Sequence, residues 1–231
     1  VAAGVLDGAE RVFGLHTAYD LEAGTVGLKP GINNAAVDHF RIRVHGKSTH
    51  VSTPHLGVDA LYIASQIVVA VQGLVTRRTS PTEPVIIGIG KLNAGTTYNA
   101  VAAFAEMEGT TRTISQESRD RVRAQVSETA QSIAALYGGT AEVEWTDFAA
   151  ALINDPQVCR EAAEVVDELL GEGHVVTDRE LSLSGDNFAE FELYKPGAYA
   201  YLGTGNPDLP HTMITNHNGG FDVDENALVT V

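Results

Sequence analysis

The hydrophobic pattern of residues 36–148 constrains the fold of this chain more than any other feature. Short stretches in which apolar and polar residues alternate predict half-buried strands, and apolar residues at helical spacing predict amphipathic helices. The elements follow one another as strand 39–45, helix 56–75, strand 85–89, strand 101–113, helix 115–137 and strand 140–145. This β-α-β-β-α-β order predicts a ferredoxin-like sandwich.

Local signals define the ends of the second helix. Ser115 has the side chain of a good N-cap, and Gly138-Gly139 can end the helix in a left-handed turn. We therefore expect a four-stranded antiparallel sheet with both helices on one of its faces.

The flanking residues, 1–35 and 149–231, have α/β character. Asp155 and Pro156 mark the start of a helix that ends at Gly171. Residues 198–202 form an apolar run without alternation, which is typical of a strand covered on both faces. We expect the sandwich 36–148 to be inserted between two halves of an α/β catalytic domain.

Charge and cysteine content exclude several classes of partner. A net charge of −15 argues against nucleic acids and anionic membranes, which need clustered Lys and Arg. We find no run of the roughly 20 apolar residues that would span a bilayer. Cys159 is the only cysteine, which fits a reducing cytoplasm. The first residues resemble the end of a helix, so we expect the chain to begin inside a domain.

Two histidines are candidates for metal ligands. His16 ends the apolar run 12–16, after which we expect a loop, and His217 lies in a polar turn that runs into an acidic stretch. Imidazole nitrogen suits zinc and manganese, although a satisfied histidine at a strand end is an equally good interpretation of His16 alone. Two nitrogens do not complete a hydrolytic site, so we expect other ligands elsewhere.

Five stretches in the same order resemble one enzyme family. They are 12–16, 46–50 with 54–59, 95–99, 109–113 and 216–228. Together they make the chain similar to the later two-thirds of an aminoacylase/carboxypeptidase-type metallohydrolase, in the branch of hippurate hydrolase, N-acyl-amino-acid and auxin-conjugate amidohydrolases.

The resemblance implies a catalytic domain with two divalent ions, zinc or manganese, and an inserted lid that also forms a homodimer. His16 and His217 would each bind one of the ions. The remaining ligands and the general-base glutamate of the family would precede Val1, and Cys159 does not replace them. The implied reaction is hydrolysis of an N-acyl amino acid or a small peptide-like conjugate.

The resemblance also implies roles for lid residues. His50 would reach the active site of the partner subunit and stabilise the oxyanion. Asn99 and Arg112 would hold the substrate by its terminal carboxylate, with the guanidinium of Arg112 as a fork. His55 would be a further polar group of the lid. The alternatives are turn chemistry for Asn99, a surface cation for Arg112 and a helix-entry residue for His55.

One stretch departs from the family pattern. Asp186 and Asn187 stand where this branch usually has Glu-Asp, which leaves the substrate open. An alternative to the enzyme is a non-catalytic, dimerising module that binds small molecules.

Overall fold

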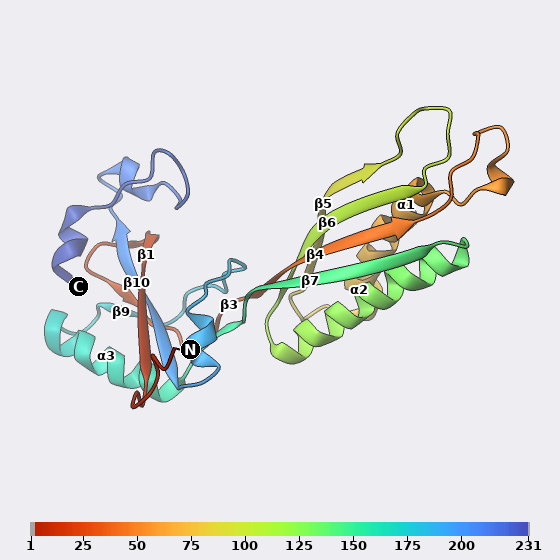
Figure 1. Ribbon diagram of the computed structural model, residues 1–231. Helices are drawn as coiled ribbons and strands as arrows, with labels where there is room; N and C mark the ends of the chain where they lie inside the picture. Colours follow the sequence, from red (N-terminus) through yellow and green to blue (C-terminus); the bar gives the residue numbers. More distant parts are fainter. Residues whose placement is uncertain (1–2, 231) are drawn as a thin grey trace. The chain divides into compact units, whose positions relative to one another are not determined.

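In the computed structural model, which describes residues 3–230, two units share the chain (Figure 1). The inserted unit comprises Ala35–Ala151 and Leu183–Gly185. The terminal unit comprises the residues up to Asn34, Leu152–Ser182 and those from Asp186 onward. Both units mix strands and helices, so the predicted α/β class is confirmed.

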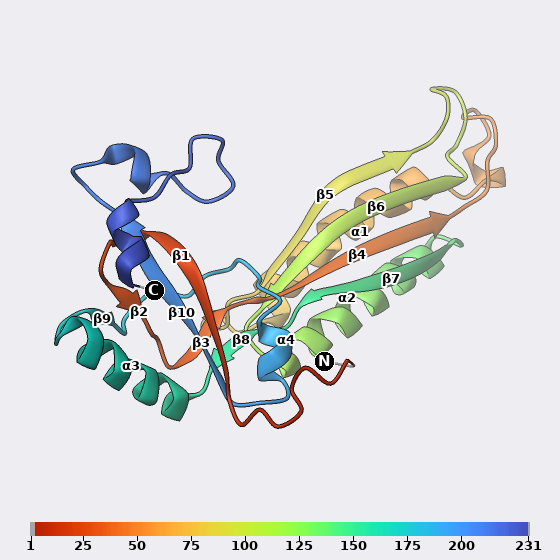
Figure 2. The same cartoon turned by 60° about the vertical axis from the view of Figure 1, so that its left-hand side comes forward.

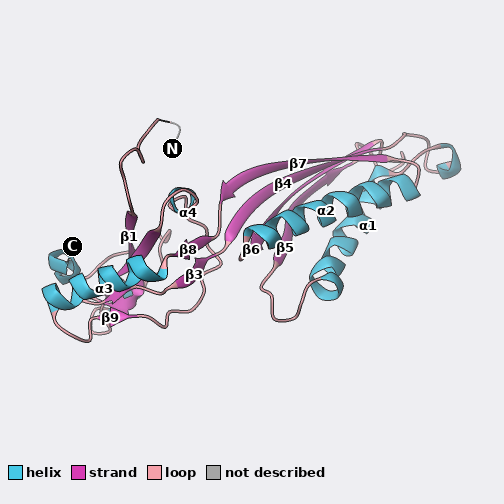
Figure 3. Ribbon diagram, turned by 90° about the horizontal axis from the view of Figure 1, so that it is seen from below, coloured by secondary structure: helices cyan, strands magenta, loops and turns pink. Residues whose placement is uncertain are grey.

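The inserted unit is a four-stranded antiparallel sheet with the order β5-β6-β4-β7. Its elements are β4 (Ala36–His45), α1 (Ala60–Gly73), β5 (Ile86–Ala94), β6 (Phe104–Thr113), α2 (Gln116–Leu136) and β7 (Thr140–Ala149). Both helices lie on the same face of the sheet (Figure 3). The predicted β-α-β-β-α-β order is therefore confirmed.

Alternation along the strands builds the core of this unit. Phe40, Ile42 and Val44 of β4 are completely buried against the helices, and the residues between them face the other side of the sheet. From α1, Ile63 and Ile67 pack into the same cluster. Burial of each such side chain stabilises the fold by roughly 1.5–3 kcal/mol.

The first helix begins later than its apolar pattern predicts. Asp59 accepts hydrogen bonds from the backbone N–H groups of Leu61 and Tyr62, and this cap starts α1 at Ala60. The residues shortly before the cap form a separate 3₁₀ turn, η1 (Pro54–Leu56). The ends of α2 agree with the prediction, because Ser115 caps its start and Gly138, just past its last turn, has a φ of 80°.

A π-helical turn, η2 (Leu74–Arg78), extends α1. Together they form the one helix in residues 3–230 that is long and apolar enough to cross a membrane, with a mean hydropathy of 1.3. Its apolar residues Ile63, Ile67, Val71 and Leu74 lie in the core of the inserted unit. One face of this helix is thus packed in the core of the inserted unit.

The terminal unit contains a four-stranded mixed sheet with the order β1-β10-β2-β9 (Figure 2). Its elements are β1 (Val12–Glu22), β2 (Val26–Gly27), β3 (Gly31–Asn34), β8 (Leu152–Asn154), α3 (Pro156–Leu170), β9 (Val175–Val176), α4 (Ala189–Glu192), β10 (Gly197–Gly205), η3 (Pro210–Met213) and η4 (Glu225–Thr230). Strand β10 pairs in parallel with β1 and is buried along nearly its whole length, as its unbroken apolar run predicts. Asp155 caps α3 as expected.

Candidate functional site

His16 lies in the middle of β1, so the expectation that a loop follows it is wrong. The strand continues to Glu22, and His16 pairs with Tyr201 of β10. Regular pairing between the two strands is interrupted only after Ala18. The reason is that β10 supplies a hydrogen-bonding partner for the polar residues after His16, which the local sequence does not reveal.

Hydrogen bonding fixes the tautomer of His16. Its Nδ1 lies 2.8 Å from the carbonyl oxygen of Thr17. A carbonyl can only accept, so Nδ1 carries the proton and Nε2 of the neutral ring has a free lone pair. Metal-binding histidines commonly show this arrangement, with one nitrogen donating to a carbonyl and the other available to the metal.

Two tyrosine rings lie beside His16, and one of them is hydrogen-bonded to Asp186. The rings of Tyr199 and Tyr201 lie 6.1 and 6.2 Å from the imidazole. The Tyr199 hydroxyl donates to Asp186 at 2.7 Å. Burial, followed by the hydrogen bond and charge of Asp186, raises the pKa of Tyr199, so this phenol stays protonated. Asp186 also accepts from the N–H of Phe188, so its carboxylate is held within the terminal unit.

His217 has an unusual backbone conformation. Its φ of 63° makes it the one non-glycine residue between residues 3 and 230 with a positive φ. A left-handed histidine costs of order 1 kcal/mol, and such strain gathers at functional sites. The preceding residue, Asn216, has a buried side-chain oxygen without a hydrogen-bond partner in the described structure.

The imidazole nitrogens of His16 and His217 are suitable ligands for a divalent ion, but two ligands are too few for a complete site. No group of three or more His, Cys, Asp or Glu side chains in the described part of the chain could hold a metal ion. Cys159 is buried on α3, in the core of the terminal unit. His16 and His217 can therefore contribute one imidazole each, and further ligands are needed.

His50 has the opposite tautomer from His16. Its Nδ1 accepts the backbone N–H of Ser52 at 3.2 Å and lies 2.6 Å from the Ser52 hydroxyl. The proton of the neutral ring is therefore on Nε2, which is a hydrogen-bond donor. The residue is exposed, so this donor is accessible. Sequence reasoning missed Ser52, although a Ser two residues after a His is the signal for such a contact.

Asn99 lies beside His50. An isolated antiparallel bridge joins His50 to Ala100, and the N–H of Val51 donates to the Asn99 carbonyl at 3.1 Å. The Thr97 hydroxyl donates to the side-chain oxygen of Asn99, which is exposed. His55 is exposed on η1 in the loop that follows His50.

Arg112 lies at the far end of β6 from Asn99. Its Nη1 donates to the Thr110 hydroxyl at 2.7 Å and to the Thr111 carbonyl at 3.1 Å. Burial lowers the pKa of Arg112 and is opposed by attraction to Asp38. No carboxylate lies within 4 Å of its guanidinium in residues 3–230, although Arg41, Arg43 and Lys91 on the same sheet all have one. Thr110 is a second residue that sequence reasoning missed.

The length of β6 separates these groups. Arg112 lies eight residues along the strand from Phe104, which follows the Asn99 loop. At about 3.3 Å per residue this is roughly 26 Å. No small ligand spans that distance, so a carboxylate held by Arg112 is out of reach of Asn99 in the same chain.

Comparison with known proteins identifies the inserted unit. A family model described as the peptidase dimerisation domain matches residues 35–137. N-acetyl-L-cysteine deacetylase of Bacillus subtilis strain 168 is 34% identical over 226 residues, or 98% of this chain and 52% of that protein. Thermostable carboxypeptidase 1 of Saccharolobus solfataricus is 33% identical over 99% of this chain and 57% of its own length.

A solved structure supports the same relationship over both units. A dinuclear metal-binding peptidase from the M20 family of Bacillus subtilis matches with a TM-score of 0.80 and 32% identity, over 99% of this chain and 56% of its own. The chain spans about half the length of the curated relatives that it matches. Over nearly its whole length, the chain is thus similar to aminoacylase/carboxypeptidase-type metallohydrolases of the M20 family.

Proposed function

We propose that this chain is part of a metal-dependent amidohydrolase that cleaves the amide bond of N-acyl amino acids or small peptide-like conjugates. The observation that carries the proposal is the exposed His50 beside Asn99, with its Nε2 proton fixed by Ser52. Two relatives, named as a deacetylase of N-acetyl-L-cysteine and a carboxypeptidase, agree with an amide substrate.

We infer a centre with two divalent ions, zinc or manganese, to which His16 and His217 contribute one nitrogen each. The free Nε2 lone pair of His16 and the strained backbone of His217 support these roles. When bound, such ions lower the pKa of water and polarise the amide carbonyl. A complete centre also requires further protein ligands and a general base, which these two histidines do not supply.

His50 acts as the oxyanion donor. Its Nε2–H can donate to the carbonyl oxygen of the substrate as negative charge develops there, which typically contributes about 2.7–4 kcal/mol. Because its Nδ1 already accepts from Ser52, the ring donates without a change of tautomer. His55, nearby on η1, is an auxiliary polar group of the same loop.

Arg112 binds the terminal carboxylate of the substrate. Its Nη1 hydrogens are held by Thr110 and Thr111, which leaves Nε and Nη2 as a two-pronged donor. The loop of Asn99 and His50 joins β6 at Phe104, roughly 26 Å along the strand from Arg112. We therefore infer that one substrate is held by Arg112 of one subunit and by His50 and Asn99 of a second. The enzyme is accordingly a homodimer.

The cytoplasm is the compartment we propose. The single cysteine, Cys159, is buried, and burial raises the pKa of its thiol, so it is an inert part of the core. A chain of this kind needs no oxidising environment to fold.

The test is hydrolysis of N-acetyl amino acids by the full-length protein, with metal content measured in parallel. We expect activity that a chelator abolishes and zinc or manganese restores, and a dimer in sedimentation. A stable monomer with full activity would contradict the shared site. A metal-free protein that binds N-acetyl amino acids without cleaving them would instead favour the non-catalytic binding module.

A further inference from the structure

The open face of the inserted sheet, opposite α1 and α2, carries its side chains in cross-strand rows. Starting from the Arg112 end, the rows are Ile86, Arg112 and Val37; then Gly88, Thr110 and His39; then Lys91, Glu108 and Arg41; then Asn93, Glu106 and Arg43. Consecutive rows lie about 7 Å apart along the strands. The second row has no side chain on β5.

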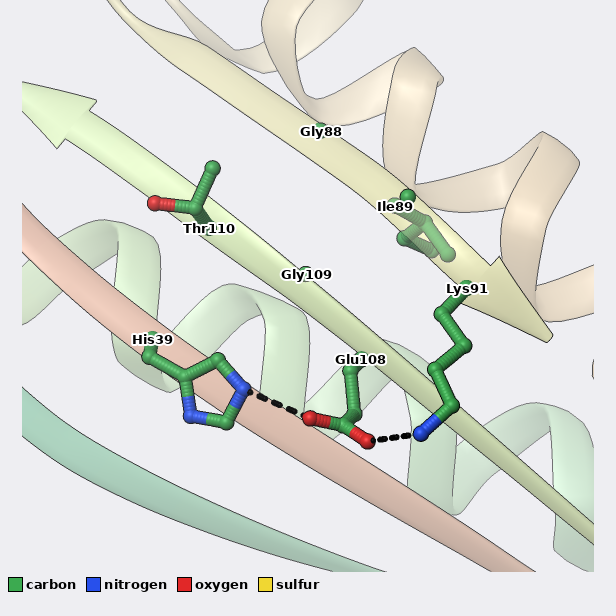
Figure 4. Close-up of a pocket in the computed structure, with 8 residues that line it drawn as sticks. His39, Gly88, Ile89, Lys91, Glu108, Gly109 and Thr110 are labelled. Carbon is green, nitrogen blue, oxygen red and sulfur yellow. Dashed lines mark hydrogen bonds and ion pairs between the residues drawn. The ribbon is translucent and has the colours of Figure 1, made fainter. Parts of the chain in front are cut away.

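This gap forms a groove of about 460 Å³ in the sheet face. Gly88 has no side chain on β5, while Thr110, Glu108 and His39 project from the neighbouring strands (Figure 4). Gly90, also on β5, lines the groove as well. Gly90 is the extra residue of a bulge, because pairing with β6 shifts between Ile89 and Lys91. The floor is therefore flat peptide backbone flanked by polar side chains.

Neither glycine is required by the backbone. Both lie outside the positive-φ region that favours glycine. A Cβ at Gly90 would meet nothing within 4 Å, and one at Gly88 would only reach the Thr110 methyl at 4.0 Å. Side chains could therefore be accommodated at both positions, and their absence is what keeps the groove open.

Thr110 joins the groove to Arg112. Its methyl group faces the bare position at Gly88, and its hydroxyl accepts from Arg112 and donates to the Asp38 carbonyl at 2.8 Å. The guanidinium thus lies within hydrogen-bond distance of a groove-lining side chain. A carboxylate bound by Nε and Nη2 of Arg112 would lie at the end of the groove.

The charged groups of the groove already have partners. Glu108 accepts from Lys91 at 2.7 Å and lies 3.1 Å from Nε2 of His39. These contacts, the Lys91 hydrogen bond first, lower the pKa of Glu108 to about 2. A charged ligand group would have to displace one of these pairs, whereas an uncharged group can lie on the glycine floor.

We propose that this groove is the subsite for the side chain of the substrate's amino acid, and that it selects large, uncharged and above all aromatic side chains. The proposal rests on the proposed role of Arg112 in holding the terminal carboxylate. The row spacing of about 7 Å matches the reach from an amino-acid carboxylate to the far part of its own side chain. A flat ring also makes the most contact with a flat floor.

The experiment introduces a side chain into the groove at Gly88 on β5. In the full-length, metal-loaded protein, Gly88→Leu should lower the ratio of kcat/KM for N-acetyl-L-phenylalanine over N-acetyl-L-alanine by about tenfold or more. Gly73→Leu is the matched control, because Gly73 ends α1, away from the groove, and a Cβ there would meet nothing within 4 Å. We expect the control to keep the wild-type ratio.

The outcomes separate this subsite from the proposed function. A Gly88→Leu protein with wild-type melting temperature and an unchanged ratio would overturn the subsite while leaving the amidohydrolase in place. Should that variant melt early, Gly88→Ala and Gly88→Val apply the same criterion with smaller side chains. A wild-type protein that hydrolyses neither substrate would refute the proposed function and the premise of the subsite together.

Discussion

The ring nitrogen that carries the proton decides whether a neutral histidine can bind a metal or donate a hydrogen bond through Nε2. His16 and His50 are fixed in opposite tautomers. Thr17 accepts from Nδ1 of His16, which leaves a lone pair on Nε2 that can bind a metal. Ser52 donates to Nδ1 of His50, which leaves a donor on Nε2. The same side chain is therefore prepared for two different roles by one backbone neighbour in each case.

The proposed donor role of His50 gives the first prediction. His50→Ala should lower kcat of the full-length enzyme by about 100- to 1,000-fold, with a smaller change in KM, because an oxyanion donor acts mainly in the transition state. Its side chain is exposed, so the melting temperature should stay at the wild-type value. Steady-state kinetics with N-acetyl amino acids would measure this, and an unchanged kcat would refute the role.

The backbone of His217 gives a second prediction. Asn tolerates a positive φ better than His, so His217→Asn should leave the metal-free protein at least as stable as the wild type. The same change should lower the bound metal by about one ion per chain, measured by elemental analysis. A loss of stability in the metal-free protein would mean that His217 has a structural role instead.

Glu192 is a half-buried residue, and one of its two carboxyl oxygens is buried without a hydrogen-bond partner in the described structure. Its Oε2 accepts the N–H of Ile153 at 2.9 Å, and its buried Oε1 has no partner in the described structure. Burial raises the pKa of Glu192 to about 7, with a further contribution from Asp155. The folded state therefore holds this proton more tightly than the unfolded state.

This shift predicts the sign of a pH dependence. The stabilising contribution is fully present below about pH 4.5 and is lost as the pH rises through about 7. Scanning calorimetry of the wild type and of Glu192→Gln between about pH 4.5 and 8 should show that the wild type loses more stability over this range. Parallel curves for the two proteins would rule out this assignment.

At the scale of elements, one buried carboxylate on β4 forms ion pairs with two arginines on α2. Asp38 is 1% exposed and accepts from the guanidinium groups of Arg119 and Arg123, at distances down to 2.6 and 2.8 Å. Arg123 also contacts Asp147 on β7 and lies over the ring of Trp145. Removing Asp38 would leave the nearly buried Arg119 without its main counter-charge.

Asp38→Ala should therefore destabilise the inserted unit by about 3–5 kcal/mol. Asp147→Ala is the control and should cost less than about 1 kcal/mol, because Asp147 is 66% exposed. Trp145 is the only tryptophan of the chain and lies on β7, so its fluorescence during urea unfolding reports on this unit. If Asp38→Ala and Asp147→Ala unfold at similar urea concentrations, the Asp38 ion pairs do not have the stabilising role expected of them.

Local pattern predicts elements well and long-range pairing poorly in this chain. The inserted unit could be predicted because the alternation of β4 and the cap at Ser115 act within a few residues, and the same holds for the cap at Asp155 in the terminal unit. The continuation of β1 beyond His16 could not, because it depends on β10, which is far away in the sequence. The separation of Asn99 from Arg112 could be predicted, because β6 is an extended strand between them. The side chains that face Arg112 could not, because they depend on pairing between distant strands.

At the scale of the whole molecule, His50 and Asn99 lie at one end of the inserted sheet and Arg112 lies toward the other end. A dimer that brings His50 and Asn99 of one chain to Arg112 of another would make activity depend on protein concentration. Mixing His50→Ala with Arg112→Ala protein should restore up to about a quarter of wild-type activity, because half of the chains form mixed dimers with one intact site of two. Activity no higher than that of the two variants alone would show that the site does not form between subunits.

Strand β1 has one further consequence. It lies at an edge of its sheet in the described structure, is 11 residues long, and exposes Phe13 and Leu15 to 55% and 41%. A long edge with bare apolar side chains is a template on which other chains add as strands, which leads to aggregation. We therefore expect this chain, produced by itself, to aggregate when its solution is concentrated. The double variant Phe13→Lys, Leu15→Lys should stay in solution and scatter less light at the same concentration, because charged side chains on an edge strand oppose the addition of further strands.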